Sequence, residues 1–215
     1  MIFANRQEAG EKLAEKLIKF KNRADAIVLG LPRGGVMVAF AAARRLNLPL
    51  DIIVPRKIGA PGNEELAIGA IGENGELVLD EALAKQLGVT PKYLAKIVAE
   101  EKEEAQRRLR IYRNGRPPLS LDGKTAILVD DGIATGSTML AAIRSAKNKK
   151  AKKIIAAAPI VAMDTLAKLK NEADDVICID APAYFGAVGA FYREFGQTQD
   201  SEVVETLQQK RGDSF

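Results

Sequence analysis

Apolar and polar positions along this chain follow two rhythms, one helical and one strand-like, which alternate from the first residues onward. Apolar residues recur at helical spacing over 9–18, which predicts an amphipathic first helix that ends near Phe20. The continuous apolar run 26–30 predicts a buried strand, a helix rich in small residues follows to Leu46, and the run 50–54 predicts the next strand. Strand, helix and strand in this order form a βαβ unit, so we expect a parallel sheet.

The middle of the chain breaks this alternation. Residues 56–80 are rich in glycine and contain two short apolar stretches, 66–71 and 77–79, so we expect a mobile loop that leads to a hairpin with its turn at Asn74-Gly75. Alternation returns in the second half of the chain. The further elements predicted are helices from Glu81 and over 91–113, 136–147 and 164–170, strands over 125–129, 153–158 and 176–179, and a short helix from about Ser201.

These elements predict a single α/β domain over residues 1–215. Its architecture is expected to be a Rossmann-like three-layer fold with a central, mostly parallel sheet of about five strands. The core is expected in residues 1–57 and 120–180, the mobile loop, hairpin and helices in 58–119, and a small C-terminal lobe, or hood, in 181–215.

Composition adds one strong exclusion, because the 215 residues include no histidine. A Ser-His-Asp triad, a Cys-His pair, a histidine zinc site and an imidazole base are therefore excluded. The single cysteine, Cys178, lies in an apolar run and is predicted to be a buried small hydrophobe. The N-terminus lacks the apolar core of a signal peptide and no apolar run is long enough to span a bilayer, so we expect a soluble, cytoplasmic protein with no membrane partner. A net charge of +4 favours anionic ligands only mildly.

The helix predicted over 91–113 carries four glutamates between positions 100 and 104, followed by four arginines between 107 and 113. An arginine-rich stretch would suit a nucleic acid. However, acids that precede bases match the helix dipole and form i,i+4 ion pairs. We therefore favour a solvated or subunit-facing helix and do not expect a nucleic-acid partner.

The segment that says most about chemistry is 129–138, where an apolar strand ends in Asp130 and Asp131 and a loop of glycine, alanine and hydroxyl residues opens a helix. Loop amides, hydroxyls and the helix N-terminus suit a phosphate dianion. No lysine precedes Ser137 or Thr138, so the segment is not a Walker loop. Two carboxylates would repel a phosphate unless they bind another part of the ligand, and the vicinal hydroxyls of a ribose are suitable donors. The pattern predicts a ribose 5-phosphate site; the alternative is a capped helix beside two solvated aspartates.

Residues 129–138 also resemble the motif by which type I phosphoribosyltransferases bind 5-phosphoribosyl diphosphate (PRPP), and the order of elements agrees over most of the chain. The resemblance implies that Asp130 and Asp131 bind the ribose hydroxyls. It implies Mg²⁺ as cofactor, held mainly by PRPP and contacted by these two aspartates directly or through the ribose, and a homo-oligomer, a dimer. The residues implied in binding the ribose and its 5-phosphate are Asp130, Asp131, Gly132, Ile133, Ala134, Thr135, Gly136, Ser137 and Thr138.

Two further segments suit a pyrophosphate. Arg33-Gly34-Gly35 follows the first strand and is similar to the family's pyrophosphate loop, although by itself it is equally consistent with a plain βα turn. Arg56 and Lys57 follow the next parallel strand, so they are expected at the same sheet edge, where they resemble the basic residues near the start of the family's mobile hood. The alternative for this pair is solvated loop charges. Residues 58–75 would form a closing loop that excludes water.

The chain is most similar to a poorly characterised subgroup of this family, with shared segments at 55–59, 65–70 and 185–192. Ala134 departs from the 6-oxopurine transferases, which place an aspartate at that position, and this argues against hypoxanthine and guanine as acceptors. Phe185, Phe191 and Tyr192, with Tyr184, are candidates for a face that stacks on the acceptor, or alternatively for the core of the lobe.

We therefore expect a Mg²⁺-dependent transfer of the 5-phosphoribosyl group from PRPP to a nitrogenous base or related acceptor, with release of pyrophosphate. Arg33, Lys57, Asp130 and Asp131 are the candidate catalytic residues, because cations and amides stabilise charge on the leaving group. Proton removal from the acceptor would fall to Glu64, Glu65 or the pyrophosphate, or to no group at all. Two alternatives remain: a regulator that senses PRPP or a nucleotide and has an RNA, DNA or protein partner, and an enzyme that only hydrolyses PRPP.

Overall fold

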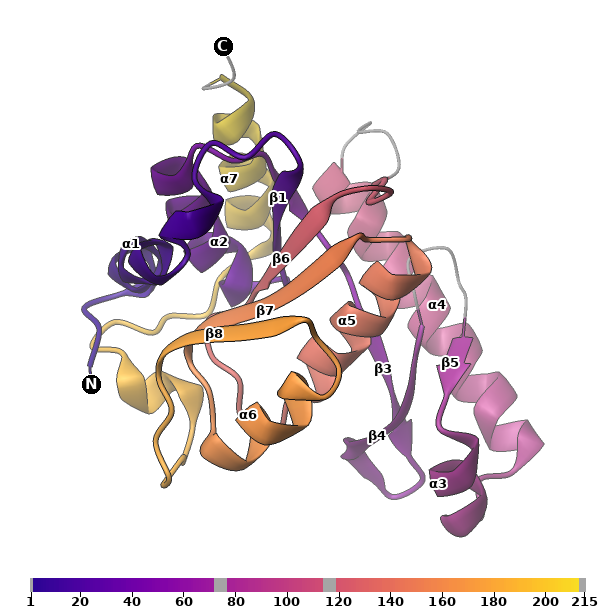
Figure 1. The fold of residues 1–215 in the computed structure, drawn as a ribbon. Coiled ribbons are helices and arrows are strands. Elements are labelled where there is room, and N and C mark those ends of the chain that lie inside the picture. The colour runs from indigo at the N-terminus through magenta and orange to yellow at the C-terminus, as the bar shows by residue number, and fades with distance from the viewer. Residues whose placement is uncertain (1, 72–76, 114–118, 213–215) are drawn as a thin grey trace.

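Five parallel strands form the central sheet, in the order β2-β1-β6-β7-β8 (Figure 1). The structure is a computed structural model that describes residues 2–71, 77–113 and 119–212. An unbroken register joins β1 to β6, and Gly30 at the end of β1 lies opposite Val129 at the end of β6. The carboxyl ends of these two strands are therefore adjacent. The strands are β1 (Ala26–Gly30), β2 (Leu50–Ile52), β6 (Thr125–Val129), β7 (Lys153–Ile160) and β8 (Asp175–Asp180).

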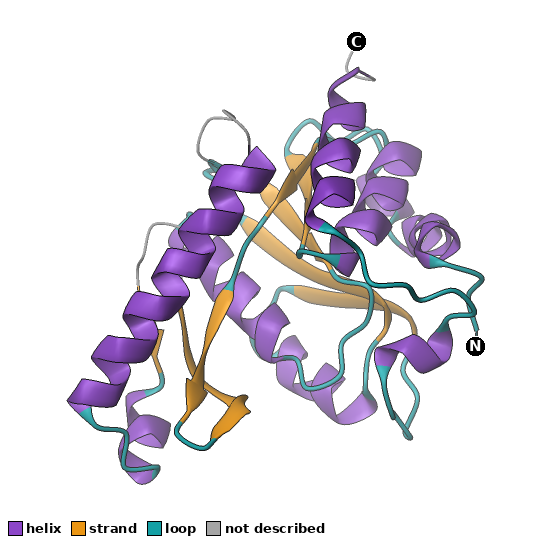
Figure 2. Ribbon diagram, turned by 180° about the vertical axis from the view of Figure 1, so that it is seen from behind, coloured by secondary structure: helices purple, strands orange, loops and turns teal. Residues whose placement is uncertain are grey.

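Helices cover both faces of this sheet, with α1, α2 and α7 on one side and α5 and α6 on the other (Figures 1 and 2). All residues of β1 and β6 are buried, as expected for strands covered on both faces. Each helix layer packs its apolar face on the sheet, for example through Leu13 of α1 on one side and Ile143 of α5 on the other. The helices are α1 (Arg6–Lys16), α2 (Gly34–Leu46), α5 (Ser137–Asn148), α6 (Met163–Lys170) and α7 (Asp200–Gly212), with 3-10 turns at Ile18–Phe20 and Val188–Phe191.

A second, antiparallel sheet, β3-β4-β5, lies beside the main body and packs against the long helix α4 (Figures 1 and 2). It has an apolar cluster of its own, in which Ile58 and Ile68 meet Leu94 and Ile97 of α4. The other end of α4 returns to the main core, where Tyr112 is buried. The elements are β3 (Arg56–Ala60), β4 (Asn63–Ile71), β5 (Leu77–Leu79), α3 (Glu81–Gln86) and α4 (Pro91–Arg113).

The predicted α/β class and central parallel sheet of five strands are confirmed, with most element bounds within two residues of their predicted ends. The loop predicted from residue 56 is wrong, because 56–60 and 63–71 pair as an antiparallel ribbon. Gly59 and Gly69, which indicated a loop, lie inside these strands, and the register shifts on both sides of Gly59. The pairing of β4 with β5 confirms the predicted hairpin, whereas its predicted turn at Asn74-Gly75 lies outside the described residues.

Cys178 is half-buried, not fully buried as predicted, because β8 is the edge strand of the sheet and all of its residues are partly exposed. Partial burial and the nearby Asp180 raise the pKa of its thiol. Within the described part of the chain, none of the helices has the length and apolar character needed to cross a membrane.

Candidate functional site

Two loops meet where β1 and β6 end side by side. The Leu31 amide donates to the Val129 carbonyl at 2.9 Å, which carries the pairing of the two strands one residue further. Gly34 and Gly35 then begin α2 directly against the aspartates. A Cβ on Gly34 would lie 2.0 Å from Asp131 Oδ2, and one on Gly35 would lie 2.8 Å from the Cα of Asp130. The two segments singled out in the sequence are therefore interlocked, and only glycine allows this approach.

Asp130 directly follows the last residue of β6. Its Oδ1 accepts a hydrogen bond from the Asp131 amide at 2.9 Å. Burial raises the pKa of Asp130 well above its usual value, and the neighbouring negative charge of Asp131 raises it further. A carboxylate in this position gains most from ligands that donate hydrogen bonds, such as the hydroxyls of a sugar.

Asp131 is held by Arg6 of α1, whose Nε donates to Oδ2 at 2.8 Å. Both side chains are largely buried, with exposed fractions of 14% for Arg6 and 15% for Asp131. The hydroxyl of Tyr192 donates to the backbone carbonyl of Asp131 from the C-terminal lobe. Sequence reasoning missed Arg6, because an arginine in the first turn of an amphipathic helix carries no signal that distinguishes it from its neighbours.

The loop that follows the aspartates is anchored by the segment where β7 leads into α6. The Ile133 amide donates to the Ile160 carbonyl at 2.9 Å, and the Ala162 amide donates to the Ile133 carbonyl at the same distance. The Thr165 hydroxyl donates to the Ala134 carbonyl at 2.5 Å. The predicted phosphate loop is therefore fixed in shape by the end of β7 and the start of α6.

The same loop opens α5 through Gly136, which has a φ of 80°. A Cβ there would lie 2.6 Å from Thr165 Cγ2, so both the backbone angle and the space require glycine. Thr135 Oγ1 lies 3.5 Å from the Ser137 amide and 3.3 Å from the Ser137 hydroxyl. Two hydroxyls thus stand at the N-terminus of a twelve-residue helix, an arrangement that favours a phosphate.

A cavity of about 440 Å³ lies between the main sheet and α4. It joins Pro32 of the first loop, Thr138 of the phosphate loop, and the basic residues Arg56 and Lys57. The structure therefore brings together three of the segments that the sequence assigned to one site. Its remaining lining comes from the segment between β2 and β3, from β3 and from one face of α4: Val54, Pro55, Gly59, Tyr93, Ile97, Glu100, Glu101 and Arg108.

The two arginines predicted to bind pyrophosphate each lie near a carboxylate. Arg56 forms a short ion pair through its Nε with Glu101 of α4. Arg33 follows a cis peptide after Pro32, and its guanidinium lies 4.0 Å from Asp200 of α7. Arg56 and Lys57 therefore line the cavity, whereas Arg33 is directed toward the start of the C-terminal helix.

Comparison with known proteins agrees with this geometry. The family model described as a phosphoribosyl transferase domain matches residues 2–193. The chain belongs to the phosphoribosyl transferase domain family. A crystal structure of the protein TT1426 from Thermus thermophilus superposes on this phosphoribosyl transferase domain with a TM-score of 0.88, at 39% identity, and the match covers 97% of this chain and 99% of that one.

Two relatives known by sequence add context. A Mycobacterium tuberculosis protein, provisionally named a phosphoribosyl transferase, is 43% identical over 212 residues, which are 99% of this chain and 48% of that protein. The chain thus spans about half the length of this relative. A ribose-phosphate pyrophosphokinase from Sulfolobus acidocaldarius is 40% identical over 86 residues, or 40% of this chain and 28% of that enzyme.

The aromatic residues of the C-terminal lobe pack mainly on one another. The ring centroids of Phe185 and Phe191 are 5.1 Å apart, and the Tyr192 ring is 5.5 Å from that of Phe3. Tyr184, in contrast, is 90% exposed. Of the two interpretations given to these residues, this packing favours the core of the lobe for Phe185, Phe191 and Tyr192, and the stacking face stays a prediction.

Helix α4 has a role that the sequence did not indicate. It was expected to be solvated or subunit-facing, but one face covers the β3-β4-β5 sheet and contributes to the cavity. Glu104 accepts hydrogen bonds from Arg107 and Arg108, each at 2.7 Å, and these bonds lower the pKa of Glu104 to about 2. The buried Arg113 donates to the Ile52 carbonyl at 3.4 Å. Arg107 and Arg108 thus form the pairs with Glu104 that the order of acids and bases predicted, and Arg113 contacts the main sheet.

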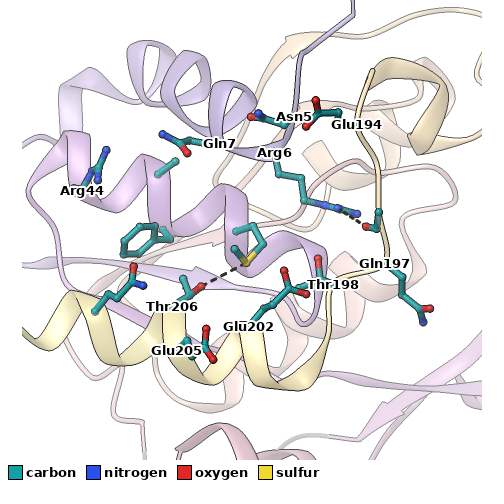
Figure 3. A pocket seen from close by; sticks show the side chains of 15 residues that line it. Asn5, Arg6, Gln7, Arg44, Glu194, Gln197, Thr198, Glu202, Glu205 and Thr206 are labelled. Atoms are coloured by element: carbon teal, nitrogen blue, oxygen red, sulfur yellow. Dashed lines mark hydrogen bonds between the residues drawn. The ribbon is translucent and has the colours of Figure 1, made fainter.

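A second cavity, of about 540 Å³, lies between α1, α2 and α7 (Figure 3). Met37 and Phe40 of α2 contribute apolar side chains to its lining. Glu202 and Glu205 line it from α7 (Figure 3). Arg6 stands at one end, with its guanidinium directed toward the Gly196 carbonyl (Figure 3). Arg6 is therefore shared between this cavity and the aspartate pair.

Proposed function

We propose that this domain transfers the 5-phosphoribosyl group from PRPP to a nitrogenous base or related acceptor and releases pyrophosphate. The observation that carries the proposal is the close packing of Gly34 and Gly35 against Asp130 and Asp131. It sets a pyrophosphate-type turn directly beside a ribose-type carboxylate pair. Ribose phosphate is also the part of the substrate named in the pyrophosphokinase relative, which supports a shared ribose phosphate site.

Each part of PRPP has a matching part of the site. Asp130 and Asp131 would accept hydrogen bonds from the ribose hydroxyls. The N-terminus of α5 would bind the 5-phosphate through its amides and through the hydroxyls of Thr135 and Ser137. Lys57 and Arg56 lie in the cavity that Thr138 also lines, and they would stabilise the negative charge that grows on the departing pyrophosphate.

The residues fit a magnesium ion that arrives with PRPP. Among the residues that the structure describes, no cluster of three or more acidic, cysteine or histidine side chains could bind a metal without help. Mg²⁺ keeps most of its ligands as water and substrate oxygens, and one or two carboxylates suffice. Asp130 and Asp131 would supply this contact, directly or through the ribose hydroxyls. When bound, Mg²⁺ would neutralise charge on the diphosphate.

We place the acceptor between α4 and the antiparallel strands β3 and β4. Ala134 offers no side-chain acid, and its carbonyl is bound by Thr165. Glu100 and Glu101 line the cavity that Lys57 also lines, which supports a role for them, beside the predicted Glu64 and Glu65, in binding the acceptor. We therefore propose an acceptor with hydrogen-bond donors, such as an amino-substituted base or an amine.

Pyrophosphate release from PRPP and Mg²⁺ tests the function, measured with and without a panel of nucleobases and small amines. Release that depends on one acceptor supports the transferase. Release without any acceptor indicates a hydrolase instead. PRPP binding with no release across the whole panel indicates a sensor, and salt-dependent RNA or DNA binding would then be measured.

A variant with Asp130→Asn and Asp131→Asn provides the residue-level test. We expect it to fold and to lose PRPP binding, because each amide loses the negative charge and keeps one acceptor oxygen in place of two. The matched control is Asp164→Asn, in the first turn of α6, where the carboxylate accepts only from the following amide at 3.0 Å among its described hydrogen bonds. Unchanged PRPP affinity in the double variant would overturn the ribose assignment.

A further inference from the structure

Arg6 lies far from the predicted site in the sequence and contacts it directly in the fold. Its Nε donates to Asp131 Oδ2 at 2.8 Å, and its Nη1 donates to the Gly196 carbonyl at 2.8 Å. Its guanidinium carbon lies 3.9 Å from the centroid of the Phe195 ring. Two hydrogen bonds and a ring contact thus fix one guanidinium group, of which only a small part is exposed.

The C-terminal lobe completes this arrangement. The Phe195 ring stacks on Tyr192, with centroids 5.0 Å apart, and the Tyr192 hydroxyl donates to the carbonyl of Asp131. Asp131 is therefore held at its side chain by α1 and at its backbone by the lobe. Each of the four residues Arg6, Phe195, Tyr192 and Asp131 therefore contacts the next, and the last contacts the first.

We infer that Arg6 is a positioning residue for the ribose-binding carboxylates, an inference that rests on the proposed function. Asp131 Oδ2 accepts the hydrogen bond from Arg6, which fixes the plane of the carboxylate. Oδ1 is then the oxygen that accepts a hydrogen bond from a ribose hydroxyl. A rotamer held in advance loses less conformational freedom when the ligand binds. Arg6 is not a catalytic residue, because it acts through Asp131.

The shape of arginine matters to this role. The two hydrogen bonds leave from different nitrogens of one planar group and reach acceptors on two different segments. A lysine has a single nitrogen and no planar face to lie on Phe195, so it can restore the charge without restoring both contacts. We therefore expect Arg6→Lys to recover only part of the loss that Arg6→Gln causes.

The test measures affinity for ribose 5-phosphate by titration calorimetry without Mg²⁺, with pyrophosphate as a second probe. Arg6→Gln is expected to weaken ribose 5-phosphate binding about tenfold, the size of one lost charged hydrogen bond. Pyrophosphate affinity, which depends on Arg56 and Lys57, should stay unchanged. Arg44→Gln is the matched control, because Arg44 lines the same second cavity from α2, where its guanidinium carbon lies 5.9 Å from the Phe40 ring centroid.

A double-mutant cycle separates positioning from a purely structural role. In an Asp131→Asn background, Arg6→Gln should have little further effect on ribose 5-phosphate affinity, whereas a general loss of stability would persist there. If Arg6→Gln does not fold, Phe195→Leu replaces it in the cycle, since it removes the ring that supports the guanidinium.

The outcomes separate the two proposals. An unmodified chain that does not bind ribose 5-phosphate overturns the proposed function and this inference with it. Binding that Arg6→Gln leaves unchanged, or equal losses in both backgrounds of the cycle, overturn the role of Arg6 alone. The positioning role of Arg6 is established if Arg6→Gln selectively weakens ribose 5-phosphate binding and has no such effect in the Asp131→Asn background.

Discussion

Replacing Gly35 with alanine tests whether the two loops are interlocked as the structure shows. The added Cβ would lie 2.8 Å from both the Cα of Asp130 and the carbonyl oxygen of Val129. Ordinary contacts of a carbon atom begin at about 3.5 Å. Both opposing atoms belong to the backbone at the end of a central strand, so no rotamer change can relieve the overlap, and α2 must move away from β6.

Two effects of opposite sign determine how much Gly35→Ala changes the free energy of unfolding. Gly35 lies in the first turn of α2 without a positive φ, so alanine would favour the helix by up to about 1 kcal/mol. Overpacking of a well-filled region costs about 1–3 kcal/mol. We expect the overlap to dominate, with a net loss of about 1–2 kcal/mol in the free energy of unfolding and a fall in Tm of about 2–8 °C for a chain of this size.

Calorimetric unfolding and ribose 5-phosphate titration measure the two consequences. The Gly35→Ala variant should melt lower and bind ribose 5-phosphate at least tenfold more weakly, by about 1.4 kcal/mol, because Asp130 is displaced. Gly186→Ala is the control, since a Cβ there would meet nothing within 4 Å and the change should be neutral. A Gly35→Ala variant that is as stable as the unmodified chain and binds equally well would refute the interlocking.

Three further predictions concern pH and charge. The fold lowers the pKa of Glu104 from 4.5 to about 2, so the stabilisation that its carboxylate provides is complete above about pH 4.5 and is lost as the pH falls toward 2. We expect Glu104→Gln to remove this acid dependence, worth about 1 kcal/mol in the free energy of unfolding, as measured by acid unfolding curves. Burial and the hydrogen bond to Asp200 raise the pKa of Tyr112 from 10.0 to about 12, so its contribution is lost as the pH rises through that window, and Tyr112→Phe should abolish the decline in alkaline unfolding. Glu101→Gln releases Arg56 from its ion pair and should tighten pyrophosphate binding severalfold in calorimetry; unchanged affinity would show that the pair does not compete with the ligand.

The sheet and its functional loops could be predicted because their signals are local. A buried parallel strand is a continuous apolar run, and 26–30 and 125–129 are both fully buried in the structure. The loops that follow them carry glycine, hydroxyl and acidic residues at strand ends, and parallel topology then gathers those ends at one edge. The meeting of Gly34 and Gly35 with the aspartates follows from these rules.

The parts that could not be predicted depend on contacts between distant segments. Arg6 and Asp131 are separated by 125 positions, and nothing in the spacing of either residue indicates the other. Helix α4 has an ordinary pattern of acids and bases, and only its packing on the β3-β4-β5 sheet brings Glu100 and Glu101 into the cavity that Lys57 also lines. The pairing of β3 with β4 has an irregular register on both sides of Gly59. Glycines in this segment therefore lie within strands, although in the sequence they indicate a loop.

The interlocking of the two loops also limits how their functions can be separated by mutation. Any side chain at Gly34 or Gly35 presses on the aspartates, so a substitution in the pyrophosphate turn perturbs the ribose site as well. Loss of activity in such a variant therefore says nothing specific about pyrophosphate. Arg56 and Lys57 reach the cavity from β3, which belongs to a separate sheet. We expect substitutions at these two positions to lower pyrophosphate affinity while leaving ribose 5-phosphate affinity intact, which is the pattern expected if separate residues bind the two parts of PRPP.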